Sequence, residues 1–211
     1  MPGSLFFLIF EWDNTFNHEW IGPRLLESLF LSITARTAGF NTVPTGNLTN
    51  MILVFLMFVG ASPGSTGGGV KTTSIAIVWS LVKSKIFNRQ DVEMFGHSIS
   101  YRVIAKALSV IILCSSMAFL AMMVLQATEF GELPHTEIRG MFLGQLFEVI
   151  SALSTVRLST GTTNHLFTAG LGVIMTCMFV GRIGPLVLAT SLIGERRQLQ
   201  FRYPEGEIMV G

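Results

Sequence analysis

Charged residues are scarce in this chain. Asp, Glu, Lys and Arg make up only 13% of its 211 residues, and 50% of the residues are hydrophobic. Soluble domains average about 25% charged residues, so this chain has too little polar surface for a soluble domain of its size and suits a place in lipid. Its net charge of +1 gives no reason to expect nucleic acid as a partner.

Cysteine and histidine are also few. The two cysteines, Cys114 and Cys177, lie inside apolar runs, where small buried or lipid-facing residues are common. The four histidines are scattered without the spacing of metal ligands. We therefore expect no disulfide, no resident metal and no cofactor.

The apolar segments differ in length, and length decides which of them can cross a membrane. Residues 107–128 carry no charge over 22 positions, enough for one span of about 20 residues. Residues 23–35 and 139–153 are too short to span and predict re-entrant helices. Residues 4–10 resemble the last turns of a spanning helix whose beginning is missing, so we expect a fragment of a longer protein or a late-starting gene model.

The distribution of charge predicts the orientation. The basic groups at 83–106 and 196–202 should be cytoplasmic by the positive-inside rule, and the acidic loop at 129–138 then lies outside. Both short helices would enter the membrane from the outside. A unit of helix, re-entrant helix, loop and helix thus occurs almost twice.

A short segment repeats 118 residues apart, as Thr-Ala-Gly-Phe-Asn at 37–41 and Thr-Val-Arg-Leu-Ser at 155–159. Each copy follows a short helix and precedes an apolar segment with the tetrapeptide Met-Phe-Val-Gly (57–60 and 178–181). Such duplication in a membrane protein predicts a site between repeats. Backbone carbonyls there could replace the water shell of a cation, with glycine supplying the necessary dihedral angles. The alternative is that each segment is simply a turn after a short helix.

The glycine-rich stretch at 60–69 interrupts an apolar region. Its backbone groups cannot face lipid, so it must line a watery cavity or pack inside protein. A phosphate-binding loop would need G-x-x-x-x-G-K-[ST], but Val70 stands between Gly69 and Lys71 and breaks that spacing. We expect an intramembrane loop and no enzyme activity, with a nucleotide-binding enzyme as a remote alternative.

Three motifs together resemble the Trk/Ktr/HKT potassium-transporter family, and most of all its bacterial Trk and Ktr membrane subunits. They are Thr-Ala-Arg-Thr-Ala-Gly-Phe-Asn-Thr (34–42), Gly-Ala-Ser-Pro-Gly-Ser-Thr-Gly-Gly-Gly-Val-Lys-Thr-Thr (60–73) and Phe-Val-Gly-Arg-Ile-Gly-Pro (179–185). The resemblance covers nearly the whole chain. It implies an all-α membrane protein with helix–pore loop–helix repeats, of which this chain would hold the last two of four.

The resemblance also implies a division of the chain and a function. Residues 1–87 would form the third repeat, 88–100 a cytoplasmic loop, 101–194 the fourth repeat, and 195–211 a cytoplasmic tail. The expected function is uptake of potassium or sodium through a selectivity filter in the plasma membrane, with the C-terminus cytoplasmic. A homodimer in the lipid bilayer, with cytosolic nucleotide-binding regulatory subunits, is the expected assembly.

Site residues follow from the matching motifs. The expected filter residues are Thr37, Ala38, Gly39, Phe40, Asn41, Thr155, Val156, Arg157, Leu158 and Ser159. The expected gating loop contains Gly60, Gly64, Ser65, Thr66, Gly67, Gly68, Gly69 and Lys71, where Lys71 either binds loop carbonyls or reaches the cytoplasmic interface. Arg182 matches an arginine of the last helix that lies near the gate. A charge at membrane depth usually faces a cavity or a partner, which agrees with this match. The alternative is a structural ion pair with Glu148 or another acid. Glu148 matches an acidic residue of the fourth pore helix. We expect it to support the filter, with direct ion binding as the alternative.

Arg157 departs from the family pattern, which has glycine at this place. Arginine does not easily take glycine's backbone conformation. Its charge would also repel a cation 4 Å away by about 4 kcal/mol at an effective dielectric near 20. Unless the side chain turns to an acid such as Glu148, we expect a poor filter. A non-conducting fragment or accessory membrane subunit is therefore the alternative function.

Overall fold

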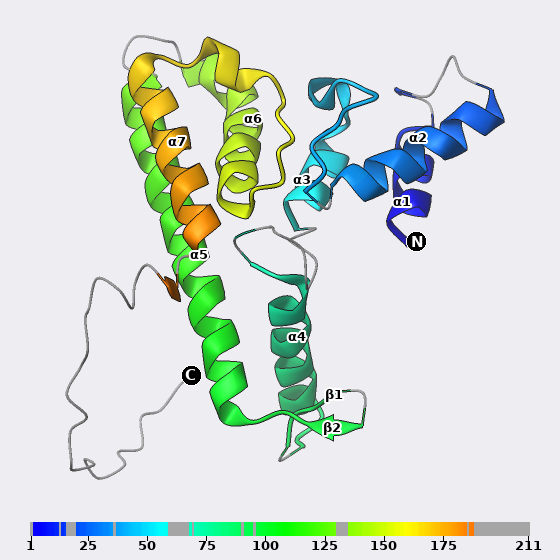
Figure 1. Ribbon diagram of the computed structural model, residues 1–211, viewed down its shortest axis with the longest axis vertical. Helices are drawn as coiled ribbons and strands as arrows, with labels where there is room; N and C mark the ends of the chain where they lie inside the picture. Colours follow the sequence, from blue (N-terminus) through cyan, green and yellow to red (C-terminus); the bar gives the residue numbers. More distant parts are fainter. Residues whose placement is uncertain are drawn as a thin grey trace.

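The structure is a computed structural model that describes residues 2–12, 14–15, 20–35, 37–58, 68, 70–89, 91–94, 96–129, 135–184 and 186–187. Most of these residues are helical, as the sequence predicts. The helices form an upper group and a lower extension, both visible in Figure 1.

The N-terminal helices belong to the upper group. They are α1 (Pro2–Phe10), α2 (Ile21–Thr34), the 3-10 turn η1 (Thr45–Asn47) and α3 (Asn50–Phe58). Helix α2 is the predicted short helix, and it begins two residues before Pro23, which the first turn of a helix tolerates because its N–H would have no partner there. It packs against α1.

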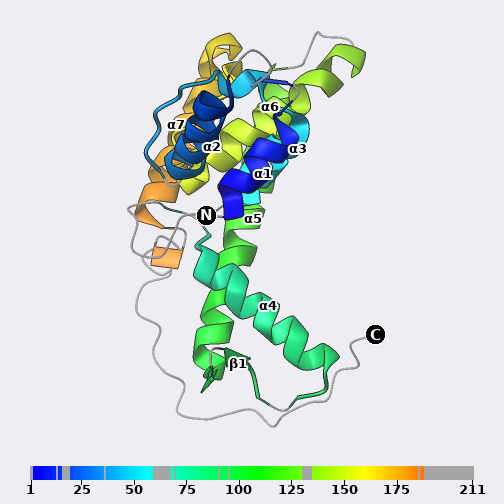
Figure 2. The same cartoon turned by 90° about the vertical axis from the view of Figure 1, so that its right-hand side faces the viewer.

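The lower extension consists of α4 (Thr72–Ile86) and the first half of α5 (Tyr101–Glu129), which pack against each other. Figure 2 shows that α4 lies below the upper group and slants across the lower part of α5. Of the described helices, α5 alone is long and apolar enough to cross a membrane, and only 22% of its most apolar window is buried. Its outward residues include Ile112, Phe119 and Leu120, an exposure that suits a helix facing lipid.

A small hairpin joins α4 to α5, and the sequence did not predict it. Strand β1 (Glu93–Met94) pairs antiparallel with β2 (His97–Ser98). Gly96, at a φ of +77°, takes the left-handed conformation that glycine adopts without cost. Two-residue strands carry no usable periodicity, so this part of 88–100 reads simply as a polar loop.

The C-terminal helices α6 (His135–Ser154) and α7 (Thr168–Ile183) complete the upper group, with the 3-10 turn η2 (Thr162–His165) between them. Helix α7 packs against both α5 and α6. It begins ten residues later than the uncharged segment at 158, because a loop and η2 occupy the intervening residues.

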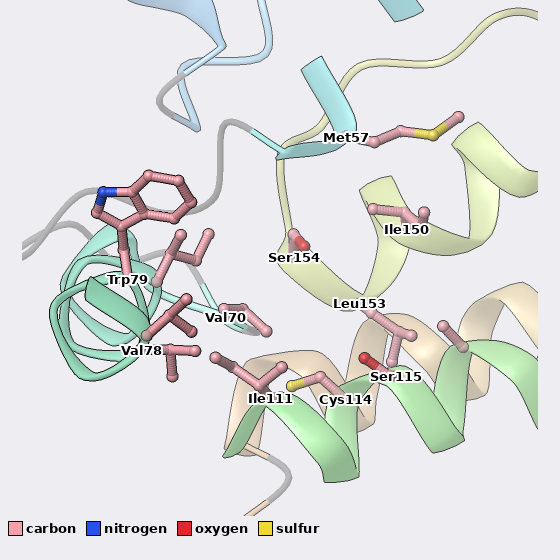
Figure 3. Close-up of a pocket in the computed structure, with 13 residues that line it drawn as sticks. Met57, Val70, Val78, Trp79, Ile111, Cys114, Ser115, Ile150, Leu153 and Ser154 are labelled. Carbon is pink, nitrogen blue, oxygen red and sulfur yellow. The ribbon is translucent and has the colours of Figure 1, made fainter. Parts of the chain in front are cut away.

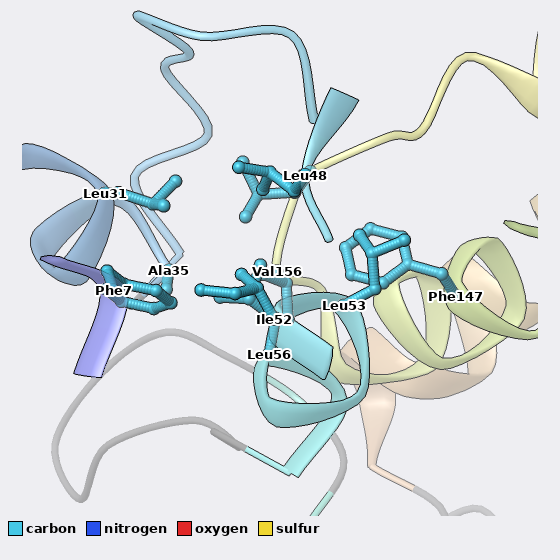
Figure 4. Close-up of a cluster of buried hydrophobic side chains, with 10 residues drawn as sticks. Phe7, Leu31, Ala35, Leu48, Ile52, Leu53, Leu56, Phe147 and Val156 are labelled. Atoms are coloured by element: carbon cyan, nitrogen blue, oxygen red, sulfur yellow. The ribbon is translucent and has the colours of Figure 1, made fainter. Parts of the chain in front are cut away.

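Two apolar clusters hold the described helices together. The first joins α1, α2, α3, α6 and the loop after α6, as Figure 4 shows for Phe7, Leu31, Ile52, Phe147 and Val156. The second joins α5, α6 and α7 through Met122, Leu125, Val149, Ala152, Leu153, Ile174 and Cys177. Helix α6 belongs to both clusters, so the loop that follows it is anchored between the two halves of the chain.

Candidate ion-filter site

Two loops follow the short helices α2 and α6, and both contain left-handed residues at the same two positions. The φ angle is +76° at Thr37 and +78° at Gly39 in the first loop, and +51° at Thr155 and +68° at Arg157 in the second. Thr37 and Thr155 are 118 residues apart in the sequence, and so are Gly39 and Arg157. The repeated sequence therefore adopts a repeated backbone conformation.

Arg157 adopts the left-handed backbone conformation that we expected only of glycine at this position. A left-handed conformation costs a residue with a side chain roughly 1–2 kcal/mol, so the surroundings must hold it. The side chains on either side, Val156 and Leu158, are only 5% and 2% exposed and belong to the first apolar cluster. Anchoring of both neighbours explains how the loop keeps this shape without a glycine.

Each loop is also tied to its own short helix by a hydroxyl group. Thr34 Oγ1 donates to the carbonyl of Phe40 at 2.6 Å and accepts from the N–H of the same residue at 3.0 Å. Ser151 Oγ donates to the carbonyl of Leu158 at 2.6 Å. Phe40 and Leu158 hold the same place in the two loops. The carbonyl after each second left-handed residue is thus held toward the helix.

The two loops lie against each other at the position where their sequences differ most. A methyl group on Gly39 would be 2.7 Å from Arg157 Cβ and 3.2 Å from its Cδ. The Arg157 side chain therefore runs through space that any side chain on Gly39 would need. The first loop is otherwise more open, with Phe40 71% exposed and Ala38 and Asn41 also exposed.

Both candidate arginines line one cavity of about 550 Å³ beside the second loop. Its lining residues are Ser151, Ala152, Thr155, Arg157, Leu158, Ser159, Met178 and Arg182. Arg157 is exposed and forms no ion pair within the described part of the chain. Arg182 projects from the last turn of α7. The cavity is thus bordered by two positive charges.

Glu148 binds the loop and not Arg157. Its Oε1 accepts hydrogen bonds from Ser159 Oγ at 2.7 Å, from the Thr160 N–H at 2.8 Å and from Thr160 Oγ1 at 3.0 Å. The side chain is 5% exposed. Three donors on one buried carboxylate oxygen hold the end of the second loop against α6.

Most of the glycine-rich stretch lies outside the described residues, namely Gly60, Gly64, Ser65, Thr66, Gly67 and Gly69. Gly68 is described, and its N–H donates to Thr155 Oγ1 at 2.9 Å. A methyl group on Gly68 would overlap the Gly181 carbonyl oxygen, and one on Gly181 would overlap that of Leu153. Glycine is therefore required at both places, and Gly68 touches the second loop directly. Lys71 is exposed at the start of α4.

Two buried glutamates near the ends of α1 and α5 were not predicted from the sequence as residues of the candidate site. Glu11 is fully buried, and its carboxylate accepts from Thr49 N–H at 2.7 Å, Thr49 Oγ1 at 2.9 Å, Thr15 Oγ1 at 2.6 Å and Asn14 Nδ2 at 2.8 Å. Burial raises the pKa of Glu11, but these hydrogen bonds act against it and leave the pKa below its ordinary value. Glu129 is 7% exposed and accepts the Phe167 N–H with both oxygens, each at 3.0 Å.

A second cavity, of about 390 Å³, lies between α4, α5 and α6. Figure 3 shows Trp79 and Val70 on one side of it, and Cys114, Ile150 and Leu153 on the other. Its lining contains no charged residue. A hydrated cation would find no compensating charge and few polar partners there. The cavity beside the second loop offers the hydroxyl groups of Ser151, Thr155 and Ser159, together with the two arginines.

Comparison with known proteins identifies the family of the chain. Residues 5–197 match the family model described as TrkH, cation transport protein. The chain is 36% identical over 211 residues to Ktr system potassium uptake protein B of Bacillus subtilis (strain 168), covering 99% of this chain and 45% of that protein. It is 33% identical to the potassium/sodium uptake protein NtpJ of Enterococcus hirae, covering 99% of this chain and 47% of that protein.

A solved structure shows the same fold. The potassium transporter TrkH of Vibrio parahaemolyticus superposes with a TM-score of 0.66 at 21% identity, over 91% of this chain and 41% of that one. The chain thus spans about half the length of the relatives it matches. With a family model covering most of its residues and relatives above 30% identity over nearly all of it, the chain belongs to the TrkH family of cation transport proteins.

Proposed function

We propose that this chain forms part of a cation pore, with the loops 37–41 and 155–159 as two of its filter segments. The observation that carries the proposal is the contact between Gly39 and Arg157, two equivalent positions with the same left-handed backbone that face each other directly. Residues that line one narrow passage from neighbouring repeats would have this relation. The hydroxyl ties from Thr34 and Ser151 give each loop a fixed backbone, as a filter of carbonyl groups requires.

The cation would be potassium or sodium, entering as cargo. The relatives are named as potassium or potassium/sodium uptake proteins. The chain would lie in the plasma membrane with its tail in the cytoplasm, because basic residues gather at 83–106 and 196–202. It would be divided as the resemblance implies, into repeats at 1–87 and 101–194 with cytoplasmic segments at 88–100 and 195–211. The family resemblance adds a homodimer and cytosolic nucleotide-binding subunits.

The gate would be the glycine-rich stretch 60–69 together with Arg182. Gly68 donates to Thr155 in the second loop and lies against Gly181, the residue before Arg182. A loop in this place would close the passage just beneath the filter. Arg182 could bind its carbonyls or repel a cation when the gate is shut, since guanidinium carries five donors and a fixed charge.

A second candidate function is a non-conducting accessory subunit of the same family. The favouring observation is that Arg157 and Arg182 line a single cavity. Two fixed positive charges oppose a permeating cation more strongly than one. The two functions differ in a single measurable property, which is cation flux.

The test is potassium uptake in cells that lack uptake systems of their own, expressing the full-length protein or Gly39→Val. We expect the unaltered protein to restore growth at low potassium. Valine should abolish it, because its Cβ would meet Arg157 at 2.7 Å and a β-branched residue rarely adopts a φ of +78°. Unchanged uptake with Gly39→Val would contradict the filter assignment. No uptake by the unaltered protein, but uptake by Arg157→Gly, would favour the accessory subunit.

A further inference from the structure

Glu11 and Glu129 repeat at the spacing of the two filter loops. They are 118 residues apart, and so are the residues whose N–H groups they accept, Thr49 and Phe167. Each glutamate lies at or just after the end of the first helix of its unit, α1 or α5. Each accepted N–H lies directly before the second helix, α3 or α7. The same contact therefore occurs at the same place in both halves of the chain.

The contact has a clear physical basis. The first N–H groups of a helix have no partner within the helix, and negative charge is favoured near that end. Phe167 precedes α7 and offers no side-chain acceptor of its own. Thr49 precedes α3, but its hydroxyl donates to Glu11. A carboxylate from another helix supplies the acceptor in both cases, and charge-assisted bonds of this kind are strong.

We propose that Glu11 and Glu129 are positioning residues for the two filter loops. Each fixes the start of the second helix to the end of the first, and the loop lies between them. The left-handed residue at 39 or 157 stands ten residues before the accepted N–H at 49 or 167. Holding that N–H therefore limits how far the loop can shift. The functional part of this inference rests on the proposed pore, whereas the hydrogen bonds of the two glutamates are independent of it.

Gly170 gives the test a decisive variant. A methyl group there would overlap Glu129 Oε1 and lie 3.0 Å from its Cδ, so alanine must displace the carboxylate. Gly172 lies in the same helix, and a methyl group on it would meet nothing within 4 Å. Alanine is the better helix former at both places. Helix propensity alone thus predicts the same small stabilisation for both variants, whereas the proposed contact predicts opposite effects.

The experiment measures amide hydrogen exchange across residues 155–170 of the full-length protein in lipid nanodiscs. We expect Glu129→Ala and Gly170→Ala to exchange at least about tenfold faster than the unaltered protein, both at Phe167 and within the loop 155–160. Gly172→Ala should exchange as slowly as the unaltered protein or more slowly. Glu129→Gln, which keeps one acceptor oxygen, should fall between Glu129→Ala and the unaltered protein.

A second reading measures the preference for potassium over sodium in uptake competition. The proposal expects Gly170→Ala to change this ratio and Gly172→Ala to keep it, because a merely destabilised protein would transport less without changing preference. Slow exchange in the loop of Gly170→Ala and Glu129→Ala would overturn the proposal, and so would fast exchange with an unchanged ratio. If the unaltered protein transports no cation, the proposed function fails, and exchange alone then decides whether the glutamates position the loops.

Discussion

Replacement of Arg157 by glycine should raise cation uptake at least about tenfold. The arginine lines the cavity beside the second loop, and its side chain lies against Gly39 of the first. At 4 Å and an effective dielectric near 20, it would repel a monovalent cation by about 4 kcal/mol. The side chain is exposed, so screening by solvent and salt lowers this value. Even one third of it, about 1.4 kcal/mol, corresponds to a tenfold change in rate.

The same replacement should stabilise the fold. Arg157 has a φ of +68°, where a residue with a side chain loses roughly 1–2 kcal/mol and glycine loses almost nothing. Part of this gain is offset by the greater freedom of glycine in the unfolded chain. We expect a net rise in thermal stability in detergent, measured by the unfolding midpoint.

Two further variants separate charge from backbone conformation. Arg157→Gln removes the charge but keeps a side chain at positive φ, and Arg157→Lys keeps the charge. If repulsion limits flux, glutamine should approach the glycine variant in uptake, and lysine should stay near arginine. If the backbone limits flux, glycine alone should raise it.

The assay is initial potassium uptake into cells without other uptake systems, divided by the amount of each variant in the membrane. Equal uptake per molecule for Arg157 and Arg157→Gly would refute the reasoning. That result would mean that the guanidinium lies away from the ion path in the assembled protein.

Two other predictions concern buried carboxylates. Glu148→Ala should lower the unfolding free energy by about 3 kcal/mol, because the donors of Ser159 and Thr160 lose their acceptor. Glu148→Gln keeps an acceptor oxygen and should lose less than half as much. Equal melting points for both variants and the unaltered protein would argue against a supporting role. The pKa of Glu11 lies below its ordinary value of 4.5 in the folded protein, so its stabilising contribution is present above that pH and is lost as pH falls through the lowered pKa. The difference in melting point between the unaltered protein and Glu11→Gln should therefore shrink below pH 4.5, and a difference that stays constant down to pH 3 would speak against it.

The helices were largely predictable, because apolar length and charge determine them. The uncharged run at 107–128 lies within α5, and the short helices at 23–35 and 139–153 correspond to α2 and α6 with small shifts at their ends. The start of α7 was not predictable in the same way. Residues 158–167 are as uncharged as the helix that follows, so charge alone does not mark the boundary. The polar cluster Ser-Thr-Gly-Thr-Thr-Asn-His at 159–165, which is typical of a loop, does mark it.

The place of the candidate site stays a prediction from the repeated segments, whereas its contacts could be described only from the structure. Repetition identified the loops at 37–41 and 155–159, and the structure gives both the same left-handed positions. Glu11 and Glu129 occupy equivalent positions at the same 118-residue spacing, and extending the comparison of the two repeats beyond the loops would have found them. Their hydrogen-bond partners could not have been found in this way, because every residue except proline has a backbone N–H and the residue types of Thr49 and Phe167 therefore do not indicate the contact.

Arg157 changes what its neighbouring loop can tolerate. The second loop keeps its shape without glycine because Val156 and Leu158 are buried on either side and Ser151 holds the Leu158 carbonyl. The first loop has no such freedom, because the Arg157 side chain occupies the space beside Gly39. Loss of glycine in one loop thus makes glycine more necessary in the other. The two positions constrain each other across the contact, and the effect of a substitution at one must depend on the residue at the other.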